Sequence, residues 1–177
     1  MQWLNSRGNR EEWFGNQHEF DGSPTKANTY YNTGYDNKSG FLNLFTDNEY
    51  NSILTTSVFT AKNTVTAGGG SETVSSKLFL LSNIEVGLPN EDSIAEGSLF
   101  PLFSDAASRI CKLTDQCFKN TLSTKKPSTV NDAWHWWLRT PDTSCSYDES
   151  FVNSSGALNN NNAFNGSYGV RPALMIS

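Results

Sequence analysis

The sequence predicts a loop-rich α+β domain, and three observations lead to this expectation. Its 177 residues are about the length of one domain. Hydrophobic residues make up 36% of the chain but aromatic residues reach 12%, and each large ring buries about 150–250 Å², so a core can form. Asn contributes 20 residues, and Asn, Gly and Ser favour turns over regular elements.

Two short helices are predicted. The first lies near residues 47–55, because Thr46 and Glu49 have the spacing of a capping box and apolar residues follow on one helix face. The second begins at Ser104 or Asp105, either of which can accept hydrogen bonds from the first amides of a helix. Its inward-facing residues are expected to be Ile110 and Leu113.

The strands are predicted to form a small antiparallel sheet with the N- and C-terminal strands near each other. Residues 77–82 have the length and apolarity of a buried, central strand. Residues 133–140 alternate with period 2, placing Trp136 and Leu138 opposite His135 and Trp137, and Pro141 ends this strand. Further strands are expected over residues 58–65, 151–152, 157–158 and 168–176, the middle two forming a hairpin; residues 159–166 are a loop or a solvated strand. The first forty residues are expected to pack irregularly around Trp3, Trp13 and Phe14.

Charge and composition exclude several partners. The net charge is −5 with 13 Lys and Arg, whereas nucleic acids and anionic membranes require clustered cations. No run of 18 apolar residues exists, so membrane insertion is not expected, and the N-terminus lacks the charged-then-apolar order of a signal peptide. Three Cys, without a Cys-x-x-Cys pair or His at ligand spacing, indicate neither a disulfide framework nor a metal site.

Catalytic residues and cofactors are not indicated either. The chain has two His and neither the Gly-x-Ser-x-Gly nor the His-Glu-x-x-His pattern, so no nucleophile with its base is evident. Cys111 and Cys117 are interpreted as buried thiols. Arg139 and Arg171 are expected to fix local structure by bonding carbonyls or a carboxylate such as Asp142. Trp134, Trp136 and Trp137 are assigned to the scaffold, with stacking on a sugar as the alternative.

A shift in composition distinguishes residues 142–169. These 28 residues contain no Lys, Gln, Met or Trp and a single Glu, Glu149, where roughly four residues of these five types would be expected from the whole chain. A low-complexity loop would explain the same bias. The segment is instead rich in Asn, Ser, Gly, Tyr and Phe, a mixture typical of binding surfaces, because the rings supply rigid contact area and the small polar residues adaptable hydrogen bonds.

The composition leads to the hypothesis of a solvent-facing binding surface on a stiff scaffold. Three aromatic residues would anchor a ligand and the Asn run would supply polar contacts. Phe151, beside Val152, is assigned to the core instead. The predicted ligand-binding residues are Ser144, Ser146, Tyr147, Asn159, Asn160, Asn161, Asn162, Phe164, Asn165 and Tyr168.

Five motifs, in order, resemble those of a bacterial and phage domain family with a C-type-lectin-like fold. The family is related to the formylglycine-generating-enzyme branch, and some members are the variable proteins of diversity-generating retroelements. The matching motifs are Gln2-Trp3-Leu4-Asn5, Gly40-Phe41-Leu42 followed by Glu49, Lys77-Leu78-Phe79-Leu80-Leu81-Ser82 with Glu85-Val86, Trp136-Trp137-Leu138-Arg139-Thr140-Pro141, and Gly169-Val170-Arg171-Pro172-Ala173-Leu174. The resemblance covers nearly the whole chain, with less signal over residues 88–130.

The resemblance implies how the C-terminal surface would vary. In these variable proteins an error-prone reverse transcription replaces adenines, and Asn codons then encode many residues but not Lys, Glu, Gln, Met or Trp. Residues 159–162 look like undiversified template, and Cys145, Tyr147, Phe164 and Tyr168 like products of substitution. Glu149 departs from this pattern and would have to be an invariant position.

The resemblance implies a ligand-binding display domain, without catalysis, whose partner is a protein or glycan on a host or neighbouring cell. Family members often carry a segment before the first motif, whereas Met1 precedes it directly here. One expectation is therefore that the sequence represents a truncated domain. As part of a larger protein, the domain would lie on a cell surface or virion. The alternatives are a structural phage or cell-surface module with an Asn-rich solvated loop and, ranked last, a lectin or enzyme remnant.

Overall fold

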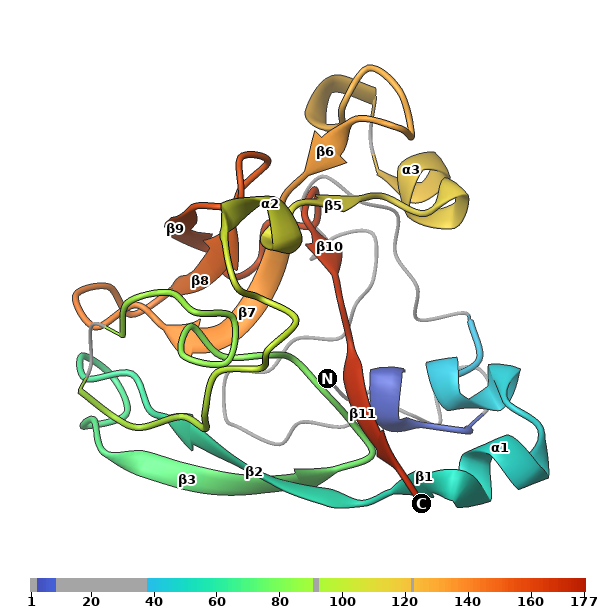
Figure 1. The fold of residues 1–177 in the computed structure, drawn as a ribbon, viewed down its shortest axis with the longest axis horizontal. Helices are drawn as coiled ribbons and strands as arrows, with labels where there is room; N and C mark the ends of the chain where they lie inside the picture. The colour runs from blue at the N-terminus through green and yellow to red at the C-terminus, as the bar shows by residue number, and fades with distance from the viewer. Residues whose placement is uncertain (1–2, 9–37, 91–92, 122) are drawn as a thin grey trace.

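The computed structural model describes residues 3–8, 38–90, 93–121 and 123–177 as an α+β fold with short helices and small sheets (Figure 1). The expected packing of Trp13 and Phe14 lies outside these residues. The helices are η1 (Trp3–Asn5), η2 (Phe41–Leu44), α1 (Asp47–Ser52), α2 (Ala106–Arg109), α3 (Asp115–Asn120) and η3 (Ser123–Lys125). The strands are β1 (Ile53–Leu54), β2 (Thr56–Ala61), β3 (Ser71–Ser76), β4 (Leu78–Phe79), β5 (Cys111–Lys112), β6 (Ala133–Trp134), β7 (Trp136–Pro141), β8 (Asp148–Val152), β9 (Leu158–Asn162), β10 (Gly169–Val170) and β11 (Ala173–Ile176).

The described strands form four small sheets. The largest has the order β10-β7-β8-β9, in which β10 and β7 are parallel and the other pairs antiparallel. A second sheet has the order β1-β11-β4, so the last strand lies between two earlier ones. The β2–β3 hairpin runs along one side of the molecule, and β5 pairs with β6 (Figure 1).

The helix starts agree with the sequence, and the helix ends do not. Thr46 and Glu49 form the expected capping box of α1, but the helix ends at Ser52 because Ile53 already pairs with Ile176. Asp105 caps α2, which ends at Arg109. Ile110 and Leu113, which follow the helix, were both expected to face inward. The prediction was wrong for Ile110, which is 41% exposed, and right for Leu113, which is buried just after β5. The third helix, α3, was not predicted.

The strand predictions were right in type and less accurate in extent. Residues 77–82 are largely buried but supply only β4, which lies at the edge of its sheet, so the expected central strand is wrong. Beyond β4, the Leu81 carbonyl accepts from the Arg139 amide instead. The predicted strand over 58–65 is β2, whose end is followed by the turn that leads to β3. The predicted strand over 168–176 divides at Arg171 and Pro172 into β10 and β11.

The predicted C-terminal hairpin is present as β8 and β9. Asn153 starts its turn, and its side-chain Oδ1 accepts from the amides of Ser155 and Ala157 at 2.8 and 3.1 Å. Gly156 completes the turn with φ +83°, and a Cβ atom there would lie 2.0 Å from the Ala106 carbonyl oxygen. Glycine is therefore required by both the backbone conformation and the close approach of α2.

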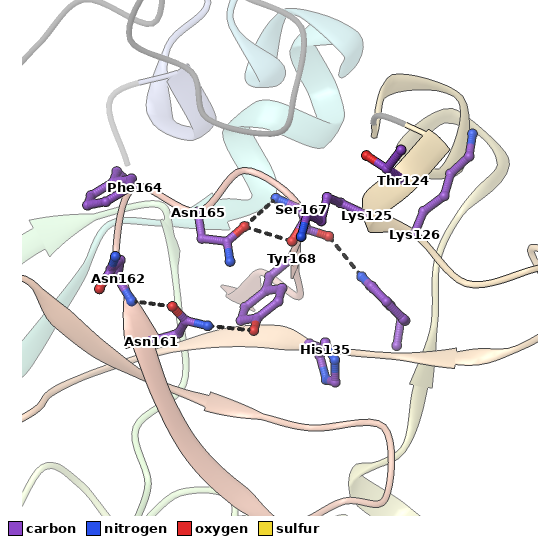
Figure 2. Close-up of a pocket in the computed structure, with 11 residues that line it drawn as sticks. Thr124, Lys125, Lys126, His135, Asn161, Asn162, Phe164, Asn165, Ser167 and Tyr168 are labelled. Atoms are coloured by element: carbon purple, nitrogen blue, oxygen red, sulfur yellow. Dashed lines mark hydrogen bonds between the residues drawn. The ribbon is translucent and has the colours of Figure 1, made fainter.

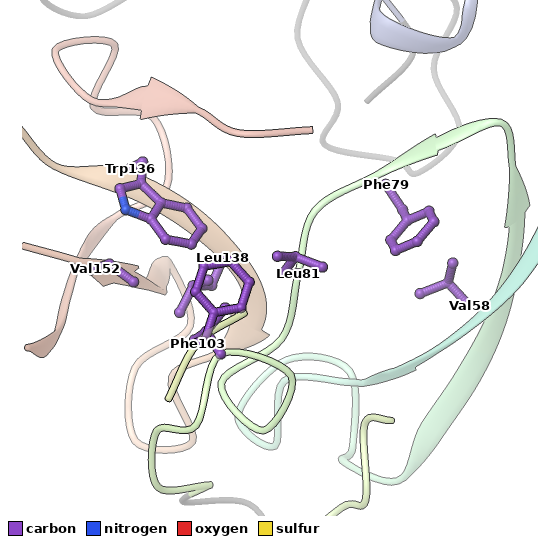
Figure 3. Packing of buried hydrophobic residues seen from close by; sticks show 8 residues of the cluster. Val58, Phe79, Leu81, Phe103, Trp136, Leu138 and Val152 are labelled. Carbon is purple, nitrogen blue, oxygen red and sulfur yellow. The ribbon is translucent and has the colours of Figure 1, made fainter. Parts of the chain in front are cut away.

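An apolar cluster joins β2, β4, β7 and β8 (Figure 3). The alternation predicted for β7 sends Trp136 and Leu138 into this cluster, at 2% and 0% exposure. The Trp136 indole Nε1 donates to the Arg109 carbonyl at 3.0 Å, which satisfies its polar atom. The remaining buried members are Val58, Phe79, Leu81, Val86, Phe103 and Val152. A second cluster of Leu4, Leu42, Ile53 and Leu78 packs η1 and η2 against β1 and β4.

A partly buried guanidinium joins segments that no sheet connects. Arg139 of β7 pairs with the Glu85 carboxylate at 2.6 and 3.0 Å and donates to the carbonyls of Phe59, Leu80 and Glu96. The expected structural role of this arginine is confirmed, with Glu85 as the carboxylate in place of Asp142. Arg171 instead lies over the rings of Phe103 and Trp136, and its buried Nη1 has no hydrogen-bond partner in the described part of the chain, so the expected bond to a carbonyl or carboxylate is not seen at that atom.

The substitution Arg139→Leu should strongly destabilise the protein. The Glu85 side chain is only 10% exposed, and the substitution removes its cationic partner. Leaving a buried charge without its partner lowers the free energy of unfolding by about 3–5 kcal/mol. Urea unfolding should show this loss. The matched control Arg7→Leu removes the exposed ion pair to Asp47 and should cost no more than about 1 kcal/mol. Equal losses in the two variants would contradict this account.

Candidate functional site

The predicted contact residues all retain solvent exposure. They lie on the loop between β7 and β8, on β9, and on the segment that leads to β10. Tyr147 and Phe164 are the most exposed large side chains among them, at 58% and 53%. The exposed members are Ser144, Ser146, Tyr147, Asn159, Asn160 and Phe164, and the half-buried members are Asn161, Asn162, Asn165 and Tyr168.

Half of these residues line one pocket with a volume of about 460 Å³ (Figure 2). This volume is within the range of small-molecule sites. The predicted residues that line it are Asn161, Asn162, Phe164, Asn165 and Tyr168, and the others are Thr124, Lys125, Lys126, Trp134, His135 and Ser167. The remaining five predicted residues, Ser144, Ser146, Tyr147, Asn159 and Asn160, do not line the pocket.

An aromatic cluster supports the pocket from beneath. The Tyr168 ring centroid lies 4.6 Å from that of Phe151, 4.8 Å from that of His135 and 4.9 Å from that of Trp137. Phe151 is 3% exposed, so its assignment to the core is confirmed. These rings lie on the opposite face of β7 from Trp136, as the alternation of a strand requires. The pocket therefore rests on rigid side chains.

Side-chain hydrogen bonds fix the polar groups of the pocket. The Asn161 amide donates to the Tyr168 hydroxyl at 2.9 Å, and Asn165 Oδ1 accepts from the amide and hydroxyl of Ser167 at 3.1 and 2.7 Å. The Trp134 indole donates to the Ser167 carbonyl at 2.8 Å. Burial raises the pKa of Tyr168, so its hydroxyl stays protonated, and burial lowers the pKa of His135 below its usual value.

Outside the pocket, Asp142 organises the β7–β8 loop. Its Oδ1 accepts from the amide and hydroxyl of Ser144, both at 2.7 Å, and its Oδ2 accepts from the Asn160 side chain. Burial acts to raise the pKa of Asp142, but these hydrogen bonds outweigh it and lower the pKa. Ser144 and Asn160 thus have a structural role in addition to their exposure.

Several pocket residues were missed by the sequence analysis. Trp134 was assigned to the scaffold, yet it is half-buried and lines the pocket. Lys125 and Lys126 belong to a segment that reads as a polar turn before Pro127. The signal that could have drawn attention to them is a pair of adjacent cations in an acidic chain.

The sequence matches the family described as Domain of unknown function (DUF6273) over residues 1–177. The chain belongs to this family. No curated protein and no solved structure matches it.

Two further properties of this DUF6273 chain concern partners. Across the described ranges, no helix is long and apolar enough to cross a membrane. Within the same ranges, no group of three or more His, Cys, Asp or Glu could hold a metal ion. Cys111, Cys117 and Cys145 are half-buried free thiols.

Glu149 differs from its neighbours on the surface because its carboxyl group points into the protein. Its Oε1 is buried and has no hydrogen-bond partner within the described part of the chain. Burial, and then the nearby Glu96 carboxylate, raise its pKa from 4.5 to about 8. The DUF6273 chain therefore holds a neutral carboxyl group at pH 7 on β8, the strand that also carries Phe151.

The substitution Glu149→Gln should stabilise the protein in a pH-dependent manner. Because folding raises this pKa, the native carboxyl is tolerated fully below pH 4.5, and stability is lost as the pH rises toward 8. The variant should match the wild type near pH 4.5 and exceed it by about 4 kcal/mol at pH 8, since each pH unit between 4.5 and 8 contributes about 1.4 kcal/mol and the contribution falls off close to pH 8. Urea unfolding at both pH values measures the difference. An equal effect at both would show that ionisation is not the cause.

Proposed function

We propose that this protein is a ligand-binding display domain with a C-type-lectin-like fold and a diversified surface at residues 142–169, as in the variable proteins of diversity-generating retroelements. It performs no catalysis in this proposal, and its partner is a protein or glycan on a host or neighbouring cell. One observation carries the proposal. The ten predicted contact residues are exposed or half-buried, whereas Glu149, which the substitution pattern cannot produce, is half-buried with a carboxyl oxygen that is buried and has no hydrogen-bond partner among the described residues.

The burial pattern within residues 142–169 supports this division. The segment also contains side chains that pack inside, and these would have to be constant: Asp142, Ser150, Phe151, Val152 and Ser167. Exposed and half-buried positions fill the stretches between these buried residues, with ten of them forming the predicted contact surface. A surface of this kind can change its contacts without changing its core.

The backbone of the variable segment supports the same conclusion. β9 pairs with β8 from Leu158 to Asn162, so its position is set by main-chain hydrogen bonds that every residue except proline permits. Asn153 and Gly156 hold the turn before it. Substitutions at residues 159–162 would therefore alter the surface while the strand stays in place.

The decisive test is the nucleotide sequence around the coding locus. We expect a reverse transcriptase gene and a near-copy of the codons for residues 142–169 that differs from them at adenines. Clonal isolates should vary at those codons, and the Glu149 and Phe151 codons should be constant. A locus without the near-copy, and isolates that never differ at residues 159–162, would favour the structural module with a solvated Asn-rich loop.

Stability should also separate contact residues from scaffold residues. Ser146→Ala and Tyr147→Ala should each change the free energy of unfolding by less than about 0.5 kcal/mol, because both side chains are exposed. Phe151→Ala, in the same hairpin but 3% exposed, should cost about 3–5 kcal/mol. Asn160→Ala should fall between these values, since it removes a hydrogen bond to Asp142. Losses of several kcal/mol at Ser146 or Tyr147, in denaturant titrations, would contradict the assignment.

A further inference from the structure

We infer that the pocket of Figure 2 binds an acidic sugar residue, that is, a single pyranose ring carrying a carboxylate. This inference rests on the proposed function and names the ligand class for one part of the proposed surface. Four properties of the pocket carry it: its charge, its amide groups, its exposed rings and its size.

The charge of the pocket is opposite to that of the chain. The chain has 18 Asp and Glu against 13 Lys and Arg, yet Lys125 and Lys126 line the pocket and, among the residues that the structure describes, no carboxylate does. Lys126 is held in place, because its Nζ donates to the Phe118 carbonyl at 2.9 Å and lies 4.2 Å from the centre of the Phe118 ring. Lys125 is exposed at the pocket wall. The local field therefore favours an anion.

The pocket also presents amide groups that suit hydroxyls. Asn165 uses its Oδ1 for Ser167, which leaves its Nδ2 as a donor, and the Asn162 side-chain amide makes no hydrogen bond to another described residue. Asn165 can therefore donate and Asn162 can both donate and accept, while each sugar hydroxyl has one donor and two acceptor lone pairs. Neighbouring amides can therefore satisfy a row of hydroxyl groups.

Rings and volume restrict the choice further. Phe164 is 53% exposed, and Trp134 and Tyr168 are half-buried in the pocket lining, so an apolar ring face can pack against them. A volume of about 460 Å³ accommodates a whole ring with its substituents. The carboxylate side chain of an acidic peptide would satisfy the charge but would leave most of this space and the amides unused.

The proposed diversification divides the pocket into two parts. Lys125, Lys126, Trp134 and His135 lie outside residues 142–169, whereas the Asn residues, Phe164 and Tyr168 lie inside them. The constant part would thus keep the preference for an anion in every copy. The variable part would select among acidic sugars by their hydroxyl pattern.

The test is an NMR titration of the full chain with methyl β-glucuronide, methyl β-glucoside and N-acetyl-glutamate amide. The glucuronide should shift resonances of Tyr168 and Asn162 and bind at least 10-fold more tightly than the other two. Its Kd should rise with salt between about 50 and 500 mM, since screening weakens the attraction of exposed charges. Equal Kd values for the glucuronide and the glucoside, or tighter binding of the glutamate compound, would overturn the inference.

Variants identify the groups involved. Lys125→Gln should raise the Kd for the glucuronide at least fivefold and leave weak glucoside binding unchanged, and Phe164→Ala should weaken both sugars. Both side chains are exposed, so these variants should fold. Lys62→Gln, a cation outside the pocket lining, should bind like the wild type. An unchanged Kd for Lys125→Gln would contradict the inferred attraction between Lys125 and the carboxylate of the sugar.

The ligand class and the proposed function fail in different ways. Adenine-linked variation at the locus without glucuronide binding would refute the ligand class alone, whereas an invariant locus would refute the diversified surface.

Discussion

The buried contacts of Arg139 are the constraint on which the arrangement of this chain depends. Its sheets are too small to connect the β2–β3 hairpin, the segment after β4 and β7 by strand pairing alone. The guanidinium, carried by β7, bonds to the other two: to the hairpin through the Phe59 carbonyl, and to the segment after β4 through the Glu85 carboxylate and the Glu96 carbonyl. Glu96, fully buried, continues the connection by accepting from the Ala61 amide and the Thr140 hydroxyl. Hydrogen bonds from charged and polar side chains thus hold distant segments in place, as backbone hydrogen bonds between strands do in larger sheets.

Fixing β7 in this way also fixes the proposed binding surface. One face of β7 packs Trp136 into the core, and the other places Trp137 beneath Tyr168. Between Trp137 and Pro141 the pairing with β8 changes register, and such irregularities bend a strand and re-aim its side chains. The β7–β8 loop then projects from the end of the sheet, where Asp142 holds it. Pocket and loop are therefore two ends of one rigid support.

The parts of the fold that could be predicted are those determined by neighbours in sequence. The capping box at Thr46, the alternation in β7 and the turn at Asn153 each depend on a few adjacent residues, and all three are present. The length of β4 and the end of α2 depend on distant partners, so they were misjudged. The pocket divides in the same way. Five of its residues lie close together in sequence and could be predicted from the composition of residues 142–169. Lys125 on η3 and Trp134 on β6 reach the pocket only through the folding of distant segments, so composition alone does not indicate them.

The Asn run has a physical advantage at the edge of a sheet. The amides of Asn153 and Ala163 bond to the hairpin partner, so in the alternating antiparallel pattern the amides of Asn160 and Asn162 point away from β8. Each of these outward amides donates to the side chain of the preceding Asn, at 2.9 and 2.7 Å. An edge strand with free amides invites pairing with another chain, and these side chains occupy the amides instead. A surface that starts from Asn is thus protected against edge-to-edge association, and each replacement of Asn159 or Asn161 exchanges that protection for a new contact.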